Sequence, residues 1–232
     1  MQQNAPQGTS LASSVEGALL YQLPKQEDNK ILVDFFERFE GVRGIPPGVS
    51  PLPKWRGEVM APRSIGNLLS HRVLLQRAKA ENWQSVLIFE DDALIDPEAN
   101  AIFDTVVKEL PSDWDILYLG GNHSLWKLKA ARKLVPVDPR LPIIDRTNRT
   151  ERVIGLYRVT DMRTTHAIGV SASAYNRLLH ALDPDFCDGP IDVNYVRLQP
   201  EMQAFVVRPH LAWQANEHYR DATDVENVTR FG

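Results

Sequence analysis

Residues 86–92 read Val-Leu-Ile-Phe-Glu-Asp-Asp, and the chain changes there from wholly apolar to wholly acidic between two neighbouring positions. A short, continuous apolar run is typical of a strand that is covered on both faces of a sheet. Ligands of open α/β sheets bind outside the carboxyl ends of the strands. The sequence therefore predicts a central strand over residues 86–89 and a ligand site at its end.

The three acidic residues that end this stretch, Glu90, Asp91 and Asp92, repel one another. Two like charges about 4 Å apart repel by roughly 4 kcal/mol at an effective dielectric constant near 20. A divalent cation with oxygen ligands offsets this repulsion, which favours a metal site. The alternative is a solvated turn, and the triplet taken alone slightly favours that alternative. Motifs elsewhere in the chain decide between the two.

Strands and helices are predicted to alternate on both sides of the acidic motif. The apolar stretches that predict strands are residues 18–23, 86–89, 116–119, 153–159, 167–170 and 204–207. The helices predicted from apolar spacing and start signals lie over 31–39, from Ser64 onward, after Asp96-Pro97 and over 174–182, and residues 44–62 form a loop. This order predicts a three-layer α/β/α domain with a mixed, mostly parallel sheet.

The composition is that of a folded protein, with 43% hydrophobic and 24% charged residues among 232. A formal net charge of −4 argues against general nucleic-acid binding. The polar residues 1–14 are expected to be a flexible N-terminal segment, followed by a single domain over 15–232. Neither a signal peptide nor an apolar run of about 20 residues is found. With Cys187 as its one cysteine, the protein is expected in the cytoplasm.

A series of short motifs occurs in a fixed order between about residues 60 and 226. The motifs are residues 65–71 (Ile-Gly-Asn-Leu-Leu-Ser-His), 86–92, 113–117 (Asp-Trp-Asp-Ile-Leu), 166–171 (His-Ala-Ile-Gly-Val-Ser), 191–192 (Ile-Asp), 209–214 (Pro-His-Leu-Ala-Trp-Gln) and 223–225 (Thr-Asp-Val). In order and spacing they resemble glycosyltransferase family 25, which includes bacterial lipopolysaccharide sugar transferases and collagen galactosyltransferases.

The resemblance implies a GT-A fold, which is Rossmann-like, and an enzyme of hexosyltransferase type. It further implies a UDP-linked nucleotide-sugar donor, Mn²⁺ or Mg²⁺, and a saccharide or lipid-linked glycan as acceptor. By the same resemblance Glu90 lies near the donor ribose, Asp92 ligates the metal, and Asp91 supports the site. Inversion at the anomeric carbon is the expected course. A cation on the diphosphate would offset the charge that develops as the glycosidic bond breaks.

Other parts of the donor site are predicted less directly. The family opens with a strand followed by arginines, whereas this chain has Lys25 there, which supplies a charge but no bidentate geometry. Ser70 and His71 are adjacent on a predicted helix and point in different directions, so donor positioning or helix packing is expected rather than nucleophilic catalysis. His166 is expected to touch the donor sugar or to tighten the entry of its strand.

The transfer needs a base that takes the proton of the acceptor hydroxyl, and a carboxylate suits that role. Asp192 is the first candidate because its Ile-Asp context matches the family, and Asp188 is the reserve. The alternative is that either aspartate caps the segment that begins at Pro190. His218 is the predicted third metal ligand, with His210 as its competitor, and both could be surface or packing residues.

Two rival functions remain open at this stage. The first is a metal-dependent hydrolase of nucleotide sugars or diphosphates, which would use the same acidic cluster with water as acceptor. The second is a non-catalytic module that binds nucleotides or glycans, an alternative that the altered first strand supports.

Overall fold

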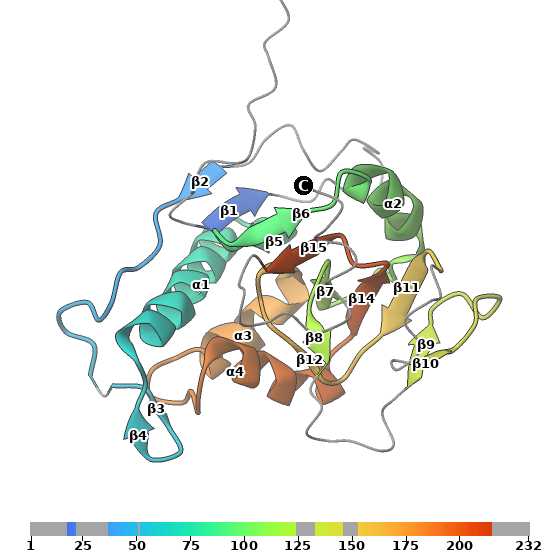
Figure 1. Ribbon diagram of the computed structural model, residues 1–232. Helices are drawn as coiled ribbons and strands as arrows, with labels where there is room; N and C mark the ends of the chain where they lie inside the picture. Colours follow the sequence, from blue (N-terminus) through green and yellow to red (C-terminus); the bar gives the residue numbers. More distant parts are fainter. Residues whose placement is uncertain (1–17, 22–36, 51, 124–132, 146–152, 215–232) are drawn as a thin grey trace, which may run out of the picture.

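The computed structural model describes residues 18–21, 37–50, 52–123, 133–145 and 153–214, and a nine-stranded sheet forms its centre (Figure 1). In sheet order the strands are β10 (Ile144–Asp145), β9 (Lys133–Pro136), β11 (Gly155–Arg158), β14 (Ala204–Arg208), β7 (Ile116–Tyr118), β13 (Ala167–Ser171), β5 (Ser85–Phe89), β1 (Ala18–Tyr21) and β2 (Glu37–Phe39). The predicted acidic strand, β5, therefore lies inside the sheet with a partner on each side.

Helices and three short ribbons complete the described part of the chain. The helices are α1 (Pro62–Ala80), α2 (Ala99–Val106), α3 (Tyr175–Ala181) and α4 (Ile191–Leu198), with 3-10 turns η1 (Val107–Glu109), η3 (Ala172–Ala174) and η4 (Gln199–Glu201). The ribbons pair β3 (Lys54–Trp55) with β4 (Glu58–Val59), β8 (Asn122–His123) with β12 (Met162–Arg163), and β6 (Ala93–Ile95) with β15 (Ala212–Gln214).

Helices cover both faces of the sheet, because the side chains of each strand alternate between the two faces. Val86 and Ile88 of β5 pack in the same core as α1, α3 and α4. Leu87 and Phe89 of the same strand belong to the second core, which α2 closes. Figure 1 shows α1, α3 and α4 gathered together and α2 apart from them. The predicted α/β class is confirmed.

The prediction of a mostly parallel sheet is wrong. Among the described strands only β7 and β14 pair in parallel, and the other neighbours in the sheet are antiparallel. The reason lies in β13, which inserts between β5 and β7 and runs against both, so that Ile168 lies opposite Ile88 on one side and Tyr118 on the other. The alternation of helices and strands along a sequence does not show which strand will insert in this way.

Several element predictions also need correction. The helix predicted over 31–39 ends in a strand instead, since residues 37–39 form β2 and pair with β1, while 31–36 lie outside the described residues. Helix α1 begins at Pro62 rather than after a Ser64 cap, because proline is favoured in the first helical turn, where its missing N–H is not needed. The strands at 18, 86, 116, 155, 167 and 204 and the helices after Asp96 and near 175 are confirmed.

The ribbon of β6 and β15 lies at the end of the sheet where β5 and β7 end. Leu211 N donates to Leu119 O at 2.7 Å, and Asp96 N donates to Leu211 O at 2.9 Å. Gly120 permits this approach, since a Cβ atom there would lie 1.9 Å from Ala212 O. The ribbon thereby brings the segment that ends at Gln214 onto the loop that follows β5.

None of the helices in the described ranges combines the length and the apolar character that a membrane span requires.

Candidate active site

The acidic triplet begins directly after β5, at the edge of the sheet where β5, β7 and β14 end and β13 begins. Glu90 N donates to His166 O at 2.8 Å, which extends the pairing of β5 and β13 by one residue. Ala93 N then donates to Glu90 O at 3.0 Å, so the chain turns sharply through Asp91 and Asp92. The predicted place of the motif, at the end of a buried central strand, is confirmed.

The side chain of Glu90 is surrounded by protein groups and is only 16% exposed. Its Oε1 accepts a hydrogen bond from Thr165 Oγ1 at 2.6 Å and one from Asn67 Nδ2 at 3.4 Å. The buried ring of His71 brings Nε2 to 3.4 Å from the same oxygen, within ion-pair distance but not aligned as a hydrogen bond. Thus α1 and the segment before β13 hold this carboxylate from two sides.

These contacts determine the ionisation of Glu90. Burial is the largest single influence and by itself raises the pKa, but His71, Thr165 and the nearby His166 together outweigh it and lower the pKa to about 2. Glu90 is therefore a carboxylate at neutral pH.

Asp92 lies in a different environment, two residues further along. Gln214 Nε2 donates to its Oδ2 at 2.8 Å across the β6–β15 ribbon. The other oxygen, Oδ1, is buried and has no hydrogen-bond partner among the described residues. Burial, reinforced by the charges of Glu90 and Asp91, raises the pKa of Asp92, although Gln214 and His166 oppose the shift. Within the described part of the chain, no positively charged side chain forms an ion pair with this carboxylate. Asp91 itself is exposed to solvent.

Asp192 approaches this region from the first turn of α4. Its Oδ2 lies 3.9 Å from Nη1 of Arg163 in β12, and the two side chains are 24% and 33% exposed. Burial is the main cause that raises the pKa of Asp192, and the charge of Glu90 adds to it, while Arg163 lowers it. A carboxylate with a raised pKa accepts protons more readily, which suits a general base.

Asp188, the reserve candidate, is placed differently. It is 62% exposed, and its Oδ2 lies 2.6 Å from Nη2 of Arg197. The structure thus gives it a surface ion pair with α4, whereas Asp192 is influenced directly by Glu90.

Ser70 and His71 divide into two roles. The Ser70 hydroxyl donates to Gly66 O at 2.7 Å and accepts from Val42 N at 2.8 Å, so it joins the chain near residue 42 to α1. His71 points to Glu90 from the same helix and meets the ring of Tyr195 edge-on, with 6.2 Å between centroids. This arrangement agrees with the prediction that adjacent helical residues point in different directions.

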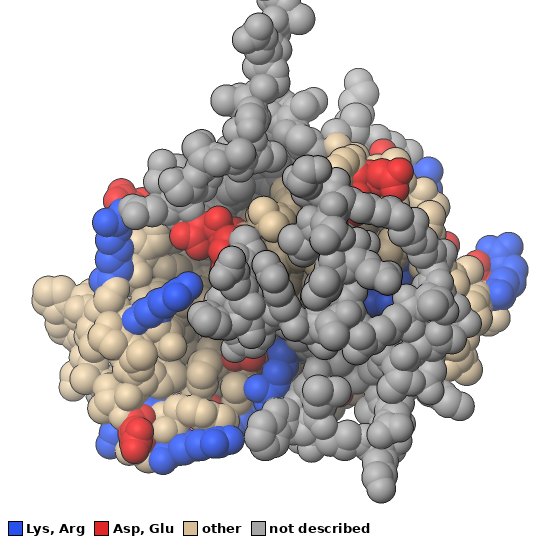
Figure 2. All heavy atoms as spheres, viewed as in Figure 1, with Lys and Arg blue, Asp and Glu red and all other residues tan. Residues whose placement is uncertain are grey.

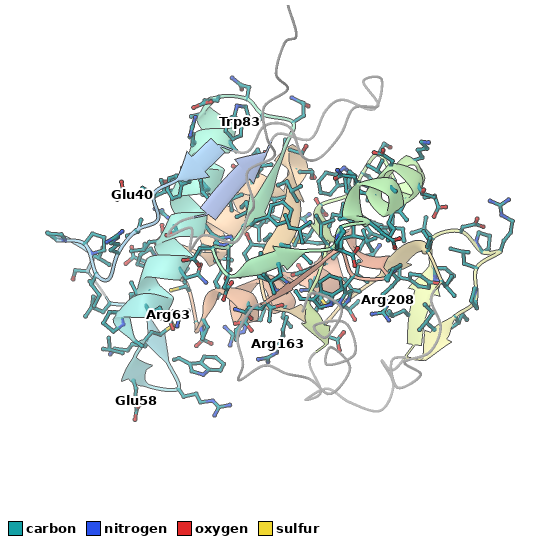
Figure 3. All side chains as sticks on the ribbon, turned by 45° about the horizontal axis from the view of Figure 1, so that its top comes forward. Glu40, Glu58, Arg63, Trp83, Arg163 and Arg208 are labelled. Carbon is teal, nitrogen blue, oxygen red and sulfur yellow. The ribbon has the colours of Figure 1, made fainter. Side chains whose placement is uncertain are left out.

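Three histidines are candidates for the site: His166 for the donor sugar or the strand entry, and His218 or its competitor His210 for the metal. His166 is buried, with Nε2 3.3 Å from Ala212 O, and burial lowers its pKa so that the ring is neutral. His210 lies beside Arg208, with 3.3 Å between its Nε2 and the Nη1 of the arginine (Arg208 is labelled in Figure 3). His218 and Lys25 lie outside the described residues.

The contributors that were not predicted as site residues include Asn67, Thr165, Gln214, Arg163 and Gln199, whose side chain hydrogen-bonds the backbone of Met162 beside Arg163. Thr165 and Gln214 belong to motifs that the sequence does reveal, but their contacts with Glu90 and Asp92 depend on pairing between distant strands. No sequence signal distinguishes Arg163 or Gln199, because their importance follows from the packing of α4 on β12.

Buried polar atoms without a hydrogen-bond partner are concentrated in this site. Six of the eleven such atoms found among the described residues are His71 Nδ1, His71 Nε2, Asp92 Oδ1, Arg163 Nε, His166 Nδ1 and Tyr195 Oη. Buried polar groups in native proteins are nearly always paired, so such a concentration indicates a place that a polar ligand or water completes.

Within the described ranges, no three His, Cys, Asp or Glu side chains are arranged so that they could hold a metal ion. A cation such as Mg²⁺ can, however, be held by one or two carboxylates together with substrate phosphates. The buried, unpartnered Oδ1 of Asp92 fits that kind of site and not a cage made only of protein ligands.

No curated protein matches the chain. The model of one family, described as glycosyltransferase family 25 (LPS biosynthesis protein), matches residues 52–138, a stretch that contains the acidic triplet and ends before Asp192. This match confirms the sequence resemblance of the chain to glycosyltransferase family 25.

Proposed function

We propose that the protein is a glycosyltransferase of hexosyltransferase type, with the GT-A fold, that uses a UDP-linked sugar donor, Mn²⁺ or Mg²⁺, and a saccharide or lipid-linked glycan acceptor. The family match supports glycosyl transfer in general. The observation that carries the more specific proposal is the Asp92 carboxylate just after β5, with one oxygen held by Gln214 and the other buried and without a hydrogen-bond partner among the described residues.

Asp92 would hold the cation, and the phosphates of the donor would supply further oxygen ligands. When bound, the cation offsets the negative charge that develops on the departing nucleoside diphosphate. Gln214 orients the Asp92 carboxylate by donating to Oδ2, which leaves Oδ1 for the ligand. His166 is neutral and buried, and it contacts the carbonyl oxygen of Ala212 in β15, which supports that strand in this part of the site.

Asp192 would act as the base on the acceptor side. The acceptor hydroxyl gives its proton to the Asp192 carboxylate while its oxygen forms a bond to the anomeric carbon. The bond from that carbon to the phosphate oxygen breaks, and the electron pair leaves with the nucleoside diphosphate. Attack opposite to the leaving group inverts the anomeric carbon.

Glu90 supports this arrangement from inside the protein. Thr165 and Asn67 hold its carboxylate, and its charge raises the pKa of both Asp92 and Asp192. The raised pKa of Asp192 favours proton uptake by that carboxylate.

The test begins with thermal-shift screening of UDP-sugars with and without Mn²⁺, since a ligand that binds only the native state stabilises it. Donors that bind are then assayed for transfer to a panel of glycan acceptors, and free sugar is measured in parallel. We expect glycoside formation that exceeds sugar release. Release of free sugar that is unchanged by any acceptor would favour the hydrolase alternative.

The variant Asp192→Asn separates binding from chemistry. It should bind the UDP-sugar as the wild type does while turnover falls by about two orders of magnitude or more. The matched control is Asp188→Asn, which removes a carboxylate that is exposed and paired with Arg197. Equal loss in both variants, or full activity of Asp192→Asn, would contradict the assignment of the base.

A further inference from the structure

Arg163 is the basic residue that approaches Asp192, yet the described residues use little of its hydrogen-bonding capacity. Its ion-pair partner among the described residues is Asp192, whose Oδ2 lies 3.9 Å from Nη1, at the outer limit of an ion pair. Its Nε is buried and has no hydrogen-bond partner among the described residues. A guanidinium has five N–H donors arranged to grip a phosphate or a carboxylate with two parallel bonds.

The backbone next to Arg163 is firmly held. Gln199, which is fully buried, accepts a hydrogen bond from Met162 N at 2.8 Å and donates to Met162 O at 2.7 Å. Gln199 Nε2 also donates to Tyr118 Oη at 2.8 Å, which connects β12 to the central strand β7. Because Gln199 follows α4 directly, the helix carries Asp192 at its first turn and this clamp just beyond its last. Both ends of α4 therefore fix Arg163 relative to Asp192.

The negative charge of the surrounding side chains also favours a positively charged side chain at this position. An anionic substrate that enters the site meets Glu90, Asp91, Asp92 and Asp192. On the face that Figure 2 draws, acidic and basic side chains lie in small mixed groups. Figure 3 labels Arg163, which lies between Arg63 and Arg208 in that view. The positive charge of a fixed guanidinium among these carboxylates would offset their repulsion of an oxyanion.

We propose that Arg163 binds an oxyanion, a phosphate or a carboxylate, of a bound substrate beside Asp192. The proposal rests on the proposed function in taking the surroundings of Asp192 as the substrate site. The oxyanion can belong to the donor diphosphate or to an acidic group on the acceptor sugar, and both present the same chemistry to the guanidinium.

The experiment measures binding by calorimetry for the wild type, Arg163→Gln, Arg163→Lys and the control Arg140→Gln. Arg140 is 88% exposed and paired with Asp138. The probes are UDP with Mn²⁺, glucose 6-phosphate, glucuronate and neutral glucose. Arg163→Gln should weaken at least one anionic probe about tenfold or more, while Arg163→Lys retains part of the affinity because it keeps the charge without the fork. Glucose binding and the Arg140→Gln variant should match the wild type.

The pattern of losses identifies the source of the oxyanion. Loss for UDP assigns it to the donor, and loss for glucose 6-phosphate or glucuronate assigns it to the acceptor. If UDP with Mn²⁺ does not bind the wild type but a sugar anion binds in an Arg163-dependent way, the donor proposal fails and the role of Arg163 stands. Equal affinities of the wild type and Arg163→Gln for every anionic probe, or no binding of any of them, overturn it. If Arg163→Gln does not fold, the affinities of the wild type are compared with those of Arg163→Lys.

Discussion

Glu90 and Asp92 follow the same strand and are separated by one residue, yet their surroundings shift their pKa values in opposite directions. Glu90 has partners on α1 and on the segment before β13, and its pKa is lowered to about 2. One oxygen of Asp92 accepts a hydrogen bond from Gln214, and the other is buried without a hydrogen-bond partner among the described residues. The pKa of Asp92 is raised. Both carboxylates are buried to a considerable degree, so burial alone does not explain the contrast.

The difference shows which acid is part of the fold and which is left for a ligand. A carboxylate whose acceptor capacity is used by the protein contributes to stability, whereas one left incomplete costs stability until a ligand completes it. This division predicts that substitution of Asp92 affects activity most, and that substitution of Glu90 affects stability most.

The largest effect is expected for Asp92→Asn. Loss of the ligand for the cation should lower metal-dependent turnover by about a thousandfold, because several kcal/mol of charge stabilisation is removed. The free energy of unfolding should change by less than about 1 kcal/mol, since the asparagine oxygen still accepts from Gln214. Steady-state kinetics and urea unfolding check the two parts. The control is Asp113→Asn, at an exposed position outside the site.

Glu90→Gln should produce the reverse pattern. It removes the charge that faces His71 and weakens the bond from Thr165, so the free energy of unfolding should fall by about 2 kcal/mol. Urea unfolding at neutral pH measures the loss. An unfolding curve that coincides with the wild type would show that Glu90 is not built into the fold in the way described.

Thr165→Val tests one contact of the same carboxylate. The valine keeps the shape of threonine but cannot donate to Glu90 Oε1, which should cost about 1 kcal/mol in unfolding free energy. Thr165→Ser retains the hydroxyl and should recover most of that stability. If serine and valine behave alike, the hydroxyl does not matter and packing explains the effect.

The smallest expected effect is a displacement of the pH profile. Asp192 acts as a base only when it is ionised, so kcat rises as pH passes upward through its pKa. Burial and the charge of Glu90 raise that pKa, and Arg163 lowers it. Arg163→Gln should therefore move the rising limb of kcat at saturating substrate to higher pH. A limb that stays in place or moves to lower pH would remove Asp192 as the titrating base.

The sequence alone predicted the α/β class and the central strand that ends in the acidic triplet. These features depend on local patterns such as the change from Phe89 to Glu90. The strand directions could not be predicted, because the insertion of β13 between β5 and β7 is a choice between distant segments. The same limit applies to Gln214 and Arg163, which reach Asp92 and Asp192 through the packing of separate elements.

The most direct test is a calorimetric titration of UDP into the wild type, Glu90→Gln and Asp92→Asn, each with and without Mn²⁺. The account predicts that Mn²⁺ tightens UDP binding about tenfold or more in the wild type and in Glu90→Gln, and leaves it unchanged in Asp92→Asn. An equal effect of Mn²⁺ in all three proteins would contradict the claim that Asp92 is the carboxylate left for a ligand.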